Sequence, residues 1–99
     1  MALKGYKLAL QADQDLVDIY DFGNYKFGAN QANKYLLKLD VCFLKLVEIP
    51  RIGKSRNEIK QGLRSFPIDS HVIFYRIMTD HIRIVRVLHC SRDIPKLFE

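Results

Sequence analysis

The sequence predicts an α+β fold in the order βααβββ, with an N-terminal helical hairpin packed on an antiparallel sheet. Two observations carry this prediction. Apolar residues recur at helical spacing through the first half of the 99-residue chain, and three strand-like runs with short connections fill the second half. Apolar residues make up 48% of the chain, which supports a packed core. The length predicts a single domain over residues 1–99.

The chain begins with a predicted strand over residues 6–11, followed by a helix over residues 12–28. In that helix Leu16, Ile19 and Tyr20 recur at helical spacing. Three early aspartates favour helix initiation, because negative charge in the first turn opposes the helix dipole.

The second predicted helix has the clearest apolar stripe in the sequence. Gly28 interrupts the first helical pattern, and Asn30 is a suitable N-cap for the second helix. This helix should end near Ile49, because Pro50 restricts the residue before it and lacks an amide donor. The short turn between the helices predicts an antiparallel hairpin. The residues of the stripe recur at steps of three and four: Ala32, Leu36, Leu39, Phe43, Leu46 and Val47.

The second half starts with a polar connector over residues 50–62, and three runs typical of strands follow. They cover residues 63–67, 71–77 and 82–90, and the short connections predict antiparallel neighbours. The last run has apolar residues on both faces, which is typical of a strand inside a sheet. A short tail over residues 91–99 ends the chain.

Cationic side chains are frequent in the predicted strands, although an unpaired charge is costly in a core. Strict alternation over residues 82–90 would place Arg83 and Arg86 on opposite faces of the sheet. No carboxylate alternates with them, so two interpretations stay open. The arginines and His89 either pair with main-chain carbonyls and acidic residues elsewhere, or bind an anionic partner. The acidic candidates are Asp69, Asp80 and Asp93.

The overall charge favours an anionic partner. Sixteen Lys and Arg against eleven Asp and Glu give a net charge of +5, which suggests nucleic acid, a nucleoprotein complex or an acidic protein. No long apolar run and no secretory signal is visible, so we expect no membrane span and a cytoplasmic protein. Cys42 and Cys90 have no metal-ligand spacing, so we expect buried, reduced thiols, no metal and no cofactor.

One catalytic chemistry is compatible with these residues, namely metal-free RNA cleavage. This reaction needs a base, an acid and cations around the phosphate. His89 is a candidate acid or base, and Arg64, Arg76 or Arg92 are candidates for holding the phosphate.

Several stretches resemble ParE toxins of the RelE/ParE superfamily of type II toxin–antitoxin modules. The resemblance covers nearly the whole chain and implies the same βααβββ order. The stretches are Arg-Ser-Phe-Pro at 64–67, "SHVIFYR" at 70–76, "IRIVRVLHCSRD" at 82–93, "IYDFG" at 19–23 and "PRIGKS" at 50–55.

The superfamily implies two different activities. RelE-like members are ribosome-dependent mRNA endonucleases that use Lys, Arg, His, Glu or Tyr side chains on the sheet and the tail. ParE-like members poison DNA gyrase and have no known hydrolytic activity of their own. The tail "IPKLFE" contributes no His or Tyr, so the resemblance favours a non-enzymatic ParE-like toxin. The alternative is a RelE-type nuclease that uses His89 and Arg64, and a third hypothesis is a member that only binds its partner.

The resemblance also implies two partners. One is a cognate antitoxin, an acidic or amphipathic protein that wraps the toxin and forms a hetero-oligomer with it. The other is the target, DNA gyrase with its bound DNA. The residues expected to contact antitoxin or target are Arg64, Arg76, Arg83, Arg86 and Arg92.

Overall fold

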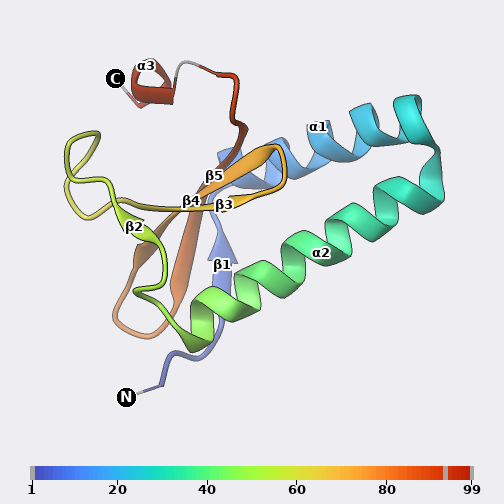
Figure 1. The fold of residues 1–99 in the computed structure, drawn as a ribbon. Helices are drawn as coiled ribbons and strands as arrows, with labels where there is room; N and C mark the ends of the chain where they lie inside the picture. The colour runs from blue at the N-terminus through green and yellow to red at the C-terminus, as the bar shows by residue number, and fades with distance from the viewer. Residues whose placement is uncertain (1, 93, 99) are drawn as a thin grey trace.

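The computed structural model describes residues 2–92 and 94–98 and has the predicted α+β fold (Figure 1). A helical hairpin covers one face of a five-stranded sheet, and a short C-terminal helix packs on the other. In chain order the elements are β1 (Tyr6–Leu8), α1 (Leu10–Phe27), α2 (Ala29–Glu48), β2 (Lys54–Ser55), β3 (Arg64–Ile68), β4 (His71–Ile77), β5 (Ile82–His89) and α3 (Ile94–Leu97). None of the helices described is both long and apolar enough to cross a membrane.

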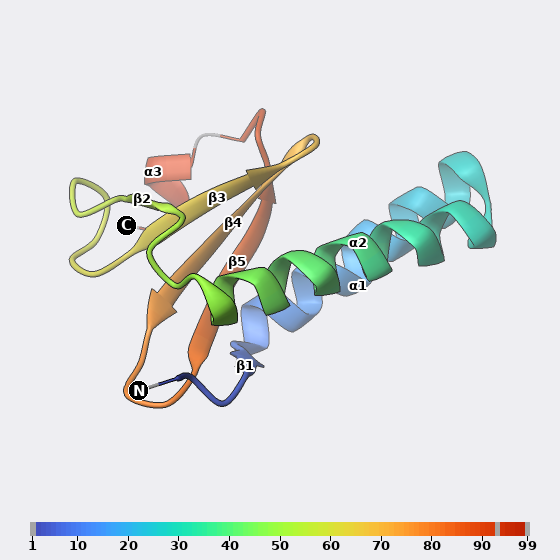
Figure 2. The ribbon, with the colours of Figure 1, turned by 60° about the horizontal axis from the view of Figure 1, so that its bottom comes forward.

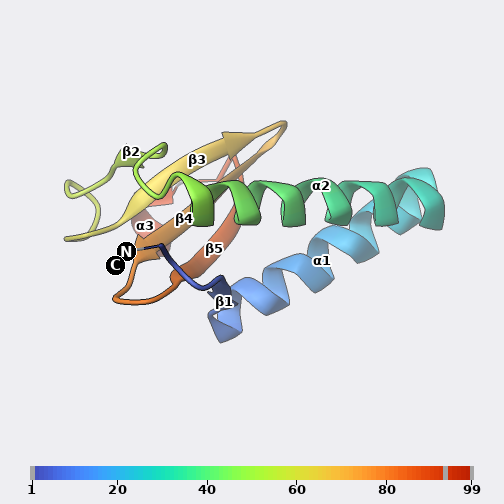
Figure 3. The same cartoon turned by 90° about the horizontal axis from the view of Figure 1, so that it is seen from below.

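The predicted hairpin is confirmed, with a tighter turn than expected. Gly28 alone separates α1 from α2, and its φ of 91° is one that residues with a side chain rarely adopt. Asn30, the predicted cap, lies inside the first turn of α2, so that prediction was wrong. The turn end of the hairpin projects beyond the sheet in all three ribbon views (Figures 1, 2 and 3).

The inner face of α2 forms the main core, as its apolar stripe predicts. Leu39, Phe43 and Leu46 are 1%, 2% and 0% exposed, and they pack with Tyr75 and Ile84 of the sheet. Burying one such side chain contributes about 1.5–3 kcal/mol, so this stripe accounts for much of the attachment of α2 to the sheet.

The sheet has the strand order β1-β5-β4-β3-β2, and β5 is an interior strand as predicted. The three predicted strands are antiparallel neighbours, but β1 pairs with β5 in parallel, so the sheet is mixed. The long stretch between β1 and β5 allows this crossover. The two-residue strand β2 lies in the predicted connector and was missed, because two residues are too few to show alternation.

A β-bulge at Val85 changes the orientation of side chains along β5. Phe74 pairs with Arg86 and Tyr75 pairs with Ile84, so Val85 has no partner in β4. A bulge of this kind interrupts the alternation of side chains between the two faces.

The bulge places Arg83 and Arg86 on the same face of the sheet. Arg83 pairs with Arg76 and Arg86 pairs with Phe74, and these two residues of β4 share a face because they are two positions apart. The prediction that Arg83 and Arg86 lie on opposite faces was wrong, because it assumed uninterrupted alternation. We call this side the tail face, since Phe98 packs on it, and the other side the helix face.

Candidate functional site

A groove runs between the helical hairpin and the end of the sheet where β3 turns into β4. It consists of two adjoining hollows of about 360 and 180 Å³, both lined by Ile19, Phe22, Ser70 and His71. We call this feature the hairpin groove. The larger hollow is also lined by Asp15, Asp18, Val87, Leu88, His89 and Arg92, and the smaller by Gly23, Phe27, Gln31, Ala32 and Tyr35.

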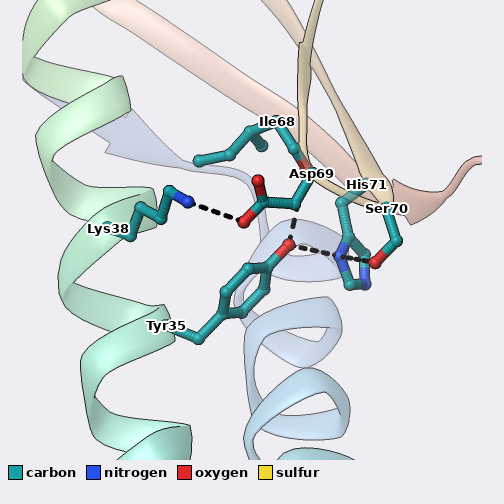
Figure 4. A network of polar contacts seen from close by, with 6 residues as sticks. All are labelled: Tyr35, Lys38, Ile68, Asp69, Ser70 and His71. Atoms are coloured by element: carbon teal, nitrogen blue, oxygen red, sulfur yellow. Dashed lines mark hydrogen bonds and ion pairs between the residues drawn. The ribbon is translucent and has the colours of Figure 1, made fainter.

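Polar contacts from α2 fix the β3–β4 turn beside this groove (Figure 4). The Tyr35 hydroxyl lies 2.6 Å from Nδ1 of His71 and 3.5 Å from the carbonyl oxygen of Ile68. One turn further along α2, Lys38 Nζ donates to Asp69 Oδ2 at 2.8 Å. Asp69 has a φ of 51°, so these contacts hold a turn conformation that is uncommon for a residue with a side chain.

The environment of this network keeps both His71 and Tyr35 uncharged near neutral pH. Burial, followed by the nearby His89, lowers the pKa of His71 below its usual 6.5. Burial, followed by the charge of Asp69, raises the pKa of Tyr35 to about 12. Tyr35 therefore keeps its proton, and its hydroxyl and the neutral ring of His71 share one hydrogen bond through Nδ1.

The groove brings together two histidines that are far apart in sequence. His71 and His89 are paired across β4 and β5, and their rings meet edge to face with centroids 5.4 Å apart. Nδ1 of His89 accepts the backbone N–H of Ser91 at 3.1 Å, so the chain after β5 orients this ring. Arg92, one of the predicted site residues, is exposed and lines the same hollow.

Arg86 forms an ion pair, because α1 contributes a carboxylate that binds it. Asp15 is buried and accepts from Nε and Nη2 of Arg86 at 2.8 and 2.9 Å. Asp15 Oδ2 also accepts the backbone N–H of Val87 at 3.0 Å. The hydrogen bond with Asp15 raises the pKa of Arg86. This pair explains how the positive charge of Arg86 is balanced within the strand.

Arg64 lies at the opposite end of the sheet and binds main-chain carbonyl groups. Its Nη2 donates to the carbonyl oxygens of Arg51 and Gly53 at 3.2 and 2.7 Å, while its buried Nε has no hydrogen-bond partner among the residues that the structure describes. The Tyr75 hydroxyl donates to Pro50 O at 2.7 Å and accepts from Gly53 N at 2.9 Å. Arg64 and Tyr75 therefore fix the loop between α2 and β2.

The predicted site residues thus fall in three places. Arg92 and His89 lie at the hairpin groove, Arg76, Arg83 and Arg86 belong to the tail face, and Arg64 lies beneath the loop after α2. Of the acidic partners considered from sequence, Asp69 binds Lys38 and Asp80 binds His81. Asp93 lies outside the residues that the structure describes.

The geometry separates the two residues required by the nuclease alternative. Arg64 is paired with Tyr75 and His89 with His71, and three residues of β4 lie between these positions. Four steps at about 3.4 Å per residue separate the two positions by about 14 Å along the strands, and β3 and β5 lie on opposite sides of β4. In this structure Arg64 is bound to main-chain carbonyls and His89 to Ser91.

A second apolar stripe on α2 was not recognised in the sequence. Leu37, Val41 and Leu44 are 67%, 64% and 50% exposed and lie on the side of α2 away from the core. Their spacing of four and three residues was the available signal, but the stronger inner stripe of the same helix obscured it. We call these three residues the α2 stripe. The flanking cations are Lys34, Lys38 and Lys45.

The potential metal ligands are dispersed in the part of the chain that is described, where no three His, Cys, Asp or Glu side chains converge. Both cysteines are free; Cys42 is half-buried, but Cys90 is exposed, so the expected burial of Cys90 was wrong. The features on which binding can depend are therefore the groove, the α2 stripe and the cationic tail face.

These features define a small α+β protein whose exposed surfaces suit macromolecular partners. Residues 6–94 match the family described as the ParE toxin of the type II toxin–antitoxin system parDE. Two relatives are both named Toxin ParE1. The one from Caulobacter vibrioides is 34% identical over 91 residues, covering 92% of this chain and 94% of the relative. The one from Mycobacterium tuberculosis is 35% identical over 92 residues, with the same coverage.

A solved structure supports the fold independently. It is titled "Chromosomal ParDE TA system from P. aeruginosa", and the match has a TM-score of 0.77 at 21% identity, covering 90% of this chain and 98% of that chain. With the family match, the conclusion is plain: the chain belongs to the ParE toxin family of type II toxin–antitoxin systems.

Proposed function

We propose that this chain is a toxin that binds DNA gyrase, traps it on cleaved DNA and has no catalytic activity of its own. The observation that carries the proposal is the family match over residues 6–94. The separation of Arg64 from His89 along the sheet and the main-chain contacts of Arg64 support a binding role over acid–base chemistry. The protein would act in the cytoplasm, and its free cysteines fit a reducing compartment.

The test is a gyrase cleavage reaction with purified toxin, ATP and supercoiled plasmid, stopped with detergent and protease. Linear DNA that forms only when toxin and gyrase are both present is the expected result. The matched variant is His89→Ala, which should leave this activity within a few fold, because acid–base catalysis, worth about 10²–10⁴-fold, is not involved. Absence of linear DNA, together with cleavage of ribosome-bound mRNA that His89→Ala abolishes, would refute the proposal.

A cognate antitoxin would hold the toxin inactive by covering the α2 stripe and the hairpin groove. An amphipathic helix with an acidic flank complements this surface, because apolar residues at i, i+4 and i+7 lie beside Lys34 and Lys45. Arg92 lies at the groove, where it would meet an acidic segment of the same partner. Partner and toxin would then form a hetero-oligomer.

The antitoxin surface is tested with Val41→Lys and with its control Asn24→Lys, an exposed position of α1 that lies outside the stripe and does not line the groove. Binding to the candidate antitoxin encoded beside the toxin gene is measured by calorimetry. Central apolar contacts contribute at least about 2 kcal/mol, so Val41→Lys should weaken binding about 30-fold or more. Asn24→Lys should leave it nearly unchanged. Equal affinity of both variants would exclude the α2 stripe from the interface.

A further inference from the structure

Three cations form a row across neighbouring strands on the tail face. Lys7 in β1 is paired with Arg83 in β5, and Arg83 is paired with Arg76 in β4. Tyr6 and Leu8 pack into the helix-face core, so the side chain of Lys7 points to the tail face. Strands lie about 4.8 Å apart, which makes this cation row about 10 Å long.

A polar hollow of about 270 Å³ continues the row. Its polar lining comes from Gln11, Lys60, Arg76 and Arg86. Arg76 lies against Gly62, where a Cβ atom would come within 3.0 Å of Nη1, and Gly62 has a φ of 82°. A glycine at this position leaves room for the guanidinium beside the hollow.

In the described part of the chain, the carboxylates near this face are bound to other cations. The pairs are Asp15–Arg86, Asp80–His81 and Glu58–Arg56. The charge of the row affects Asp80. The pKa of Asp80 is lowered, first by the hydrogen bond with His81 and in smaller part by the charge of Lys7. Within residues 2–92 and 94–98, no ion pair joins Lys7, Arg76 or Arg83 to a carboxylate.

Like charges placed directly opposite each other destabilise a sheet, so a row of three has an electrostatic cost for the isolated protein. A polyanion that contacts all three cations at once would relieve this repulsion. The β-bulge at Val85 contributes to the arrangement, because it brings Arg86 to the same face as Arg83.

The distribution of apolar surface favours nucleic acid over an acidic protein as the occupant. The large exposed apolar residues of the described chain lie on α1, on α2 and in the loop after α2, with Met78 in the β4–β5 turn as the exception. Protein interfaces have apolar centres, whereas surfaces that bind a phosphate backbone are rich in Lys and Arg. The hairpin therefore suits protein partners, and the tail face suits phosphate.

We propose that the cation row binds the sugar–phosphate backbone of duplex DNA. The inference rests on the proposed function, since it assigns the tail face to the DNA held by gyrase and leaves the hairpin for proteins. The three cations of the row can neutralise up to about three phosphates. Contacts of this kind carry no base specificity, so binding should not depend on sequence.

The test measures binding of a fluorescent duplex of about 20 base pairs without gyrase, between about 50 and 200 mM salt. Neutralising three phosphates gives a slope of about −2.7 in log K against log salt, or about 40-fold weaker binding across this range. The row variant carries Lys7→Gln, Arg76→Gln and Arg83→Gln, and its slope should be shallower by about 2.7. The control carries Lys26→Gln, Lys34→Gln and Lys45→Gln, the same change in net charge on the hairpin, and its slope should match the parent protein.

Equal slopes for the row variant and the parent, or equal losses in row and control variants, would overturn the proposal. The proposal would also be overturned if polyglutamate bound as tightly as the duplex and its binding depended on the row, because the partner would then be an acidic protein. Arg83→Gln alone changes one exposed residue and should make the slope shallower by about 0.9, which keeps the test decisive if the triple variant does not fold.

The gyrase cleavage reaction separates this inference from the proposed function. Linear DNA from toxin and gyrase together, without row-dependent duplex binding, would remove only the inference. Row-dependent duplex binding without any linear DNA would support the surface and remove the assigned target.

Discussion

Asp15 and Arg86 are 71 residues apart in the chain, and their two hydrogen bonds attach the helical hairpin to the last strand. The same carboxylate accepts the backbone N–H of Val87, beyond the point where β1 stops pairing with β5. One side chain thus neutralises a cation and satisfies a main-chain donor at the edge of the sheet.

Asp15→Ala should therefore destabilise the protein strongly. Removing one partner of a buried pair leaves the other charge uncompensated, which costs about 3–5 kcal/mol. We expect a loss of this size in the free energy of unfolding, measured by urea denaturation. Asp21→Ala, an exposed position of α1, is the control and should stay within about 0.5 kcal/mol of the parent. Equal stability of the two variants would show that the Arg86 pair contributes nothing.

The His71 network predicts a loss of stability in mild acid. Burial lowers the pKa of His71, so the unfolded chain binds a proton at a pH where the folded protein does not. Protonation then favours unfolding, and stability should fall as the pH decreases below about 6.5, then level off below the lowered pKa. Urea midpoints between about pH 8 and 5 measure this effect. In His71→Asn the decrease between about pH 6.5 and 5 should be smaller; an identical profile would contradict the role of His71.

Two tyrosines predict a second loss of stability in alkali. The pKa of Tyr6 and that of Tyr35 are both raised to about 12, chiefly by burial, with Asp40 and Asp69 respectively adding to the effect. Because the folded state keeps these protons, their stabilising contribution is present below about pH 10 and decreases as the pH rises towards about 12. The variant with both tyrosines changed to Phe should lose this dependence. Tyr25→Phe, at a position 88% exposed, should retain it.

Two glycines should respond in opposite directions to the same substitution. A Cβ atom at Gly53 would lie 2.7 Å from the Ser65 carbonyl oxygen and would also meet the Tyr75 hydroxyl, so Gly53→Ala should cost about 1–3 kcal/mol. Gly23 lies inside α1, and its Cβ would meet Ala32 at an ordinary 3.5 Å. Gly23→Ala should therefore stabilise the protein by about 0.5–1 kcal/mol. Thermal unfolding of both variants checks the pair, and a stable Gly53→Ala protein would contradict the tight packing of that loop.

The sequence predicts most of the fold because the elements have local signals. The α2 core stripe, the end of that helix before Pro50 and the three antiparallel strands are all confirmed. The failures are at places where local pattern carries no information. The register that isolates Val85 depends on pairing with β4, and the turn at Gly28 depends on a backbone angle.

The candidate surfaces were harder to predict, because they depend on residues brought together by folding. The arginines were recognised as unusual, but neither Asp15 as the partner of Arg86 nor Lys7 as the neighbour of Arg83 is visible from spacing along the chain. The contact between His71 and His89 likewise arises from strand register. Sequence pattern alone does not determine which side chains of distant elements contact one another.

The Asp15–Val87 contact also has a consequence for how other chains can approach. Exposed strand edges invite added strands and aggregation, and here the edge of β5 beyond β1 is occupied by α1. At the opposite side β2 pairs with only two residues of β3, and Pro67 in the remainder has no N–H to donate. The edge strands β1 and β2 have only three and two residues, so both borders of the sheet are short, and we expect binding partners to be selected by side chains.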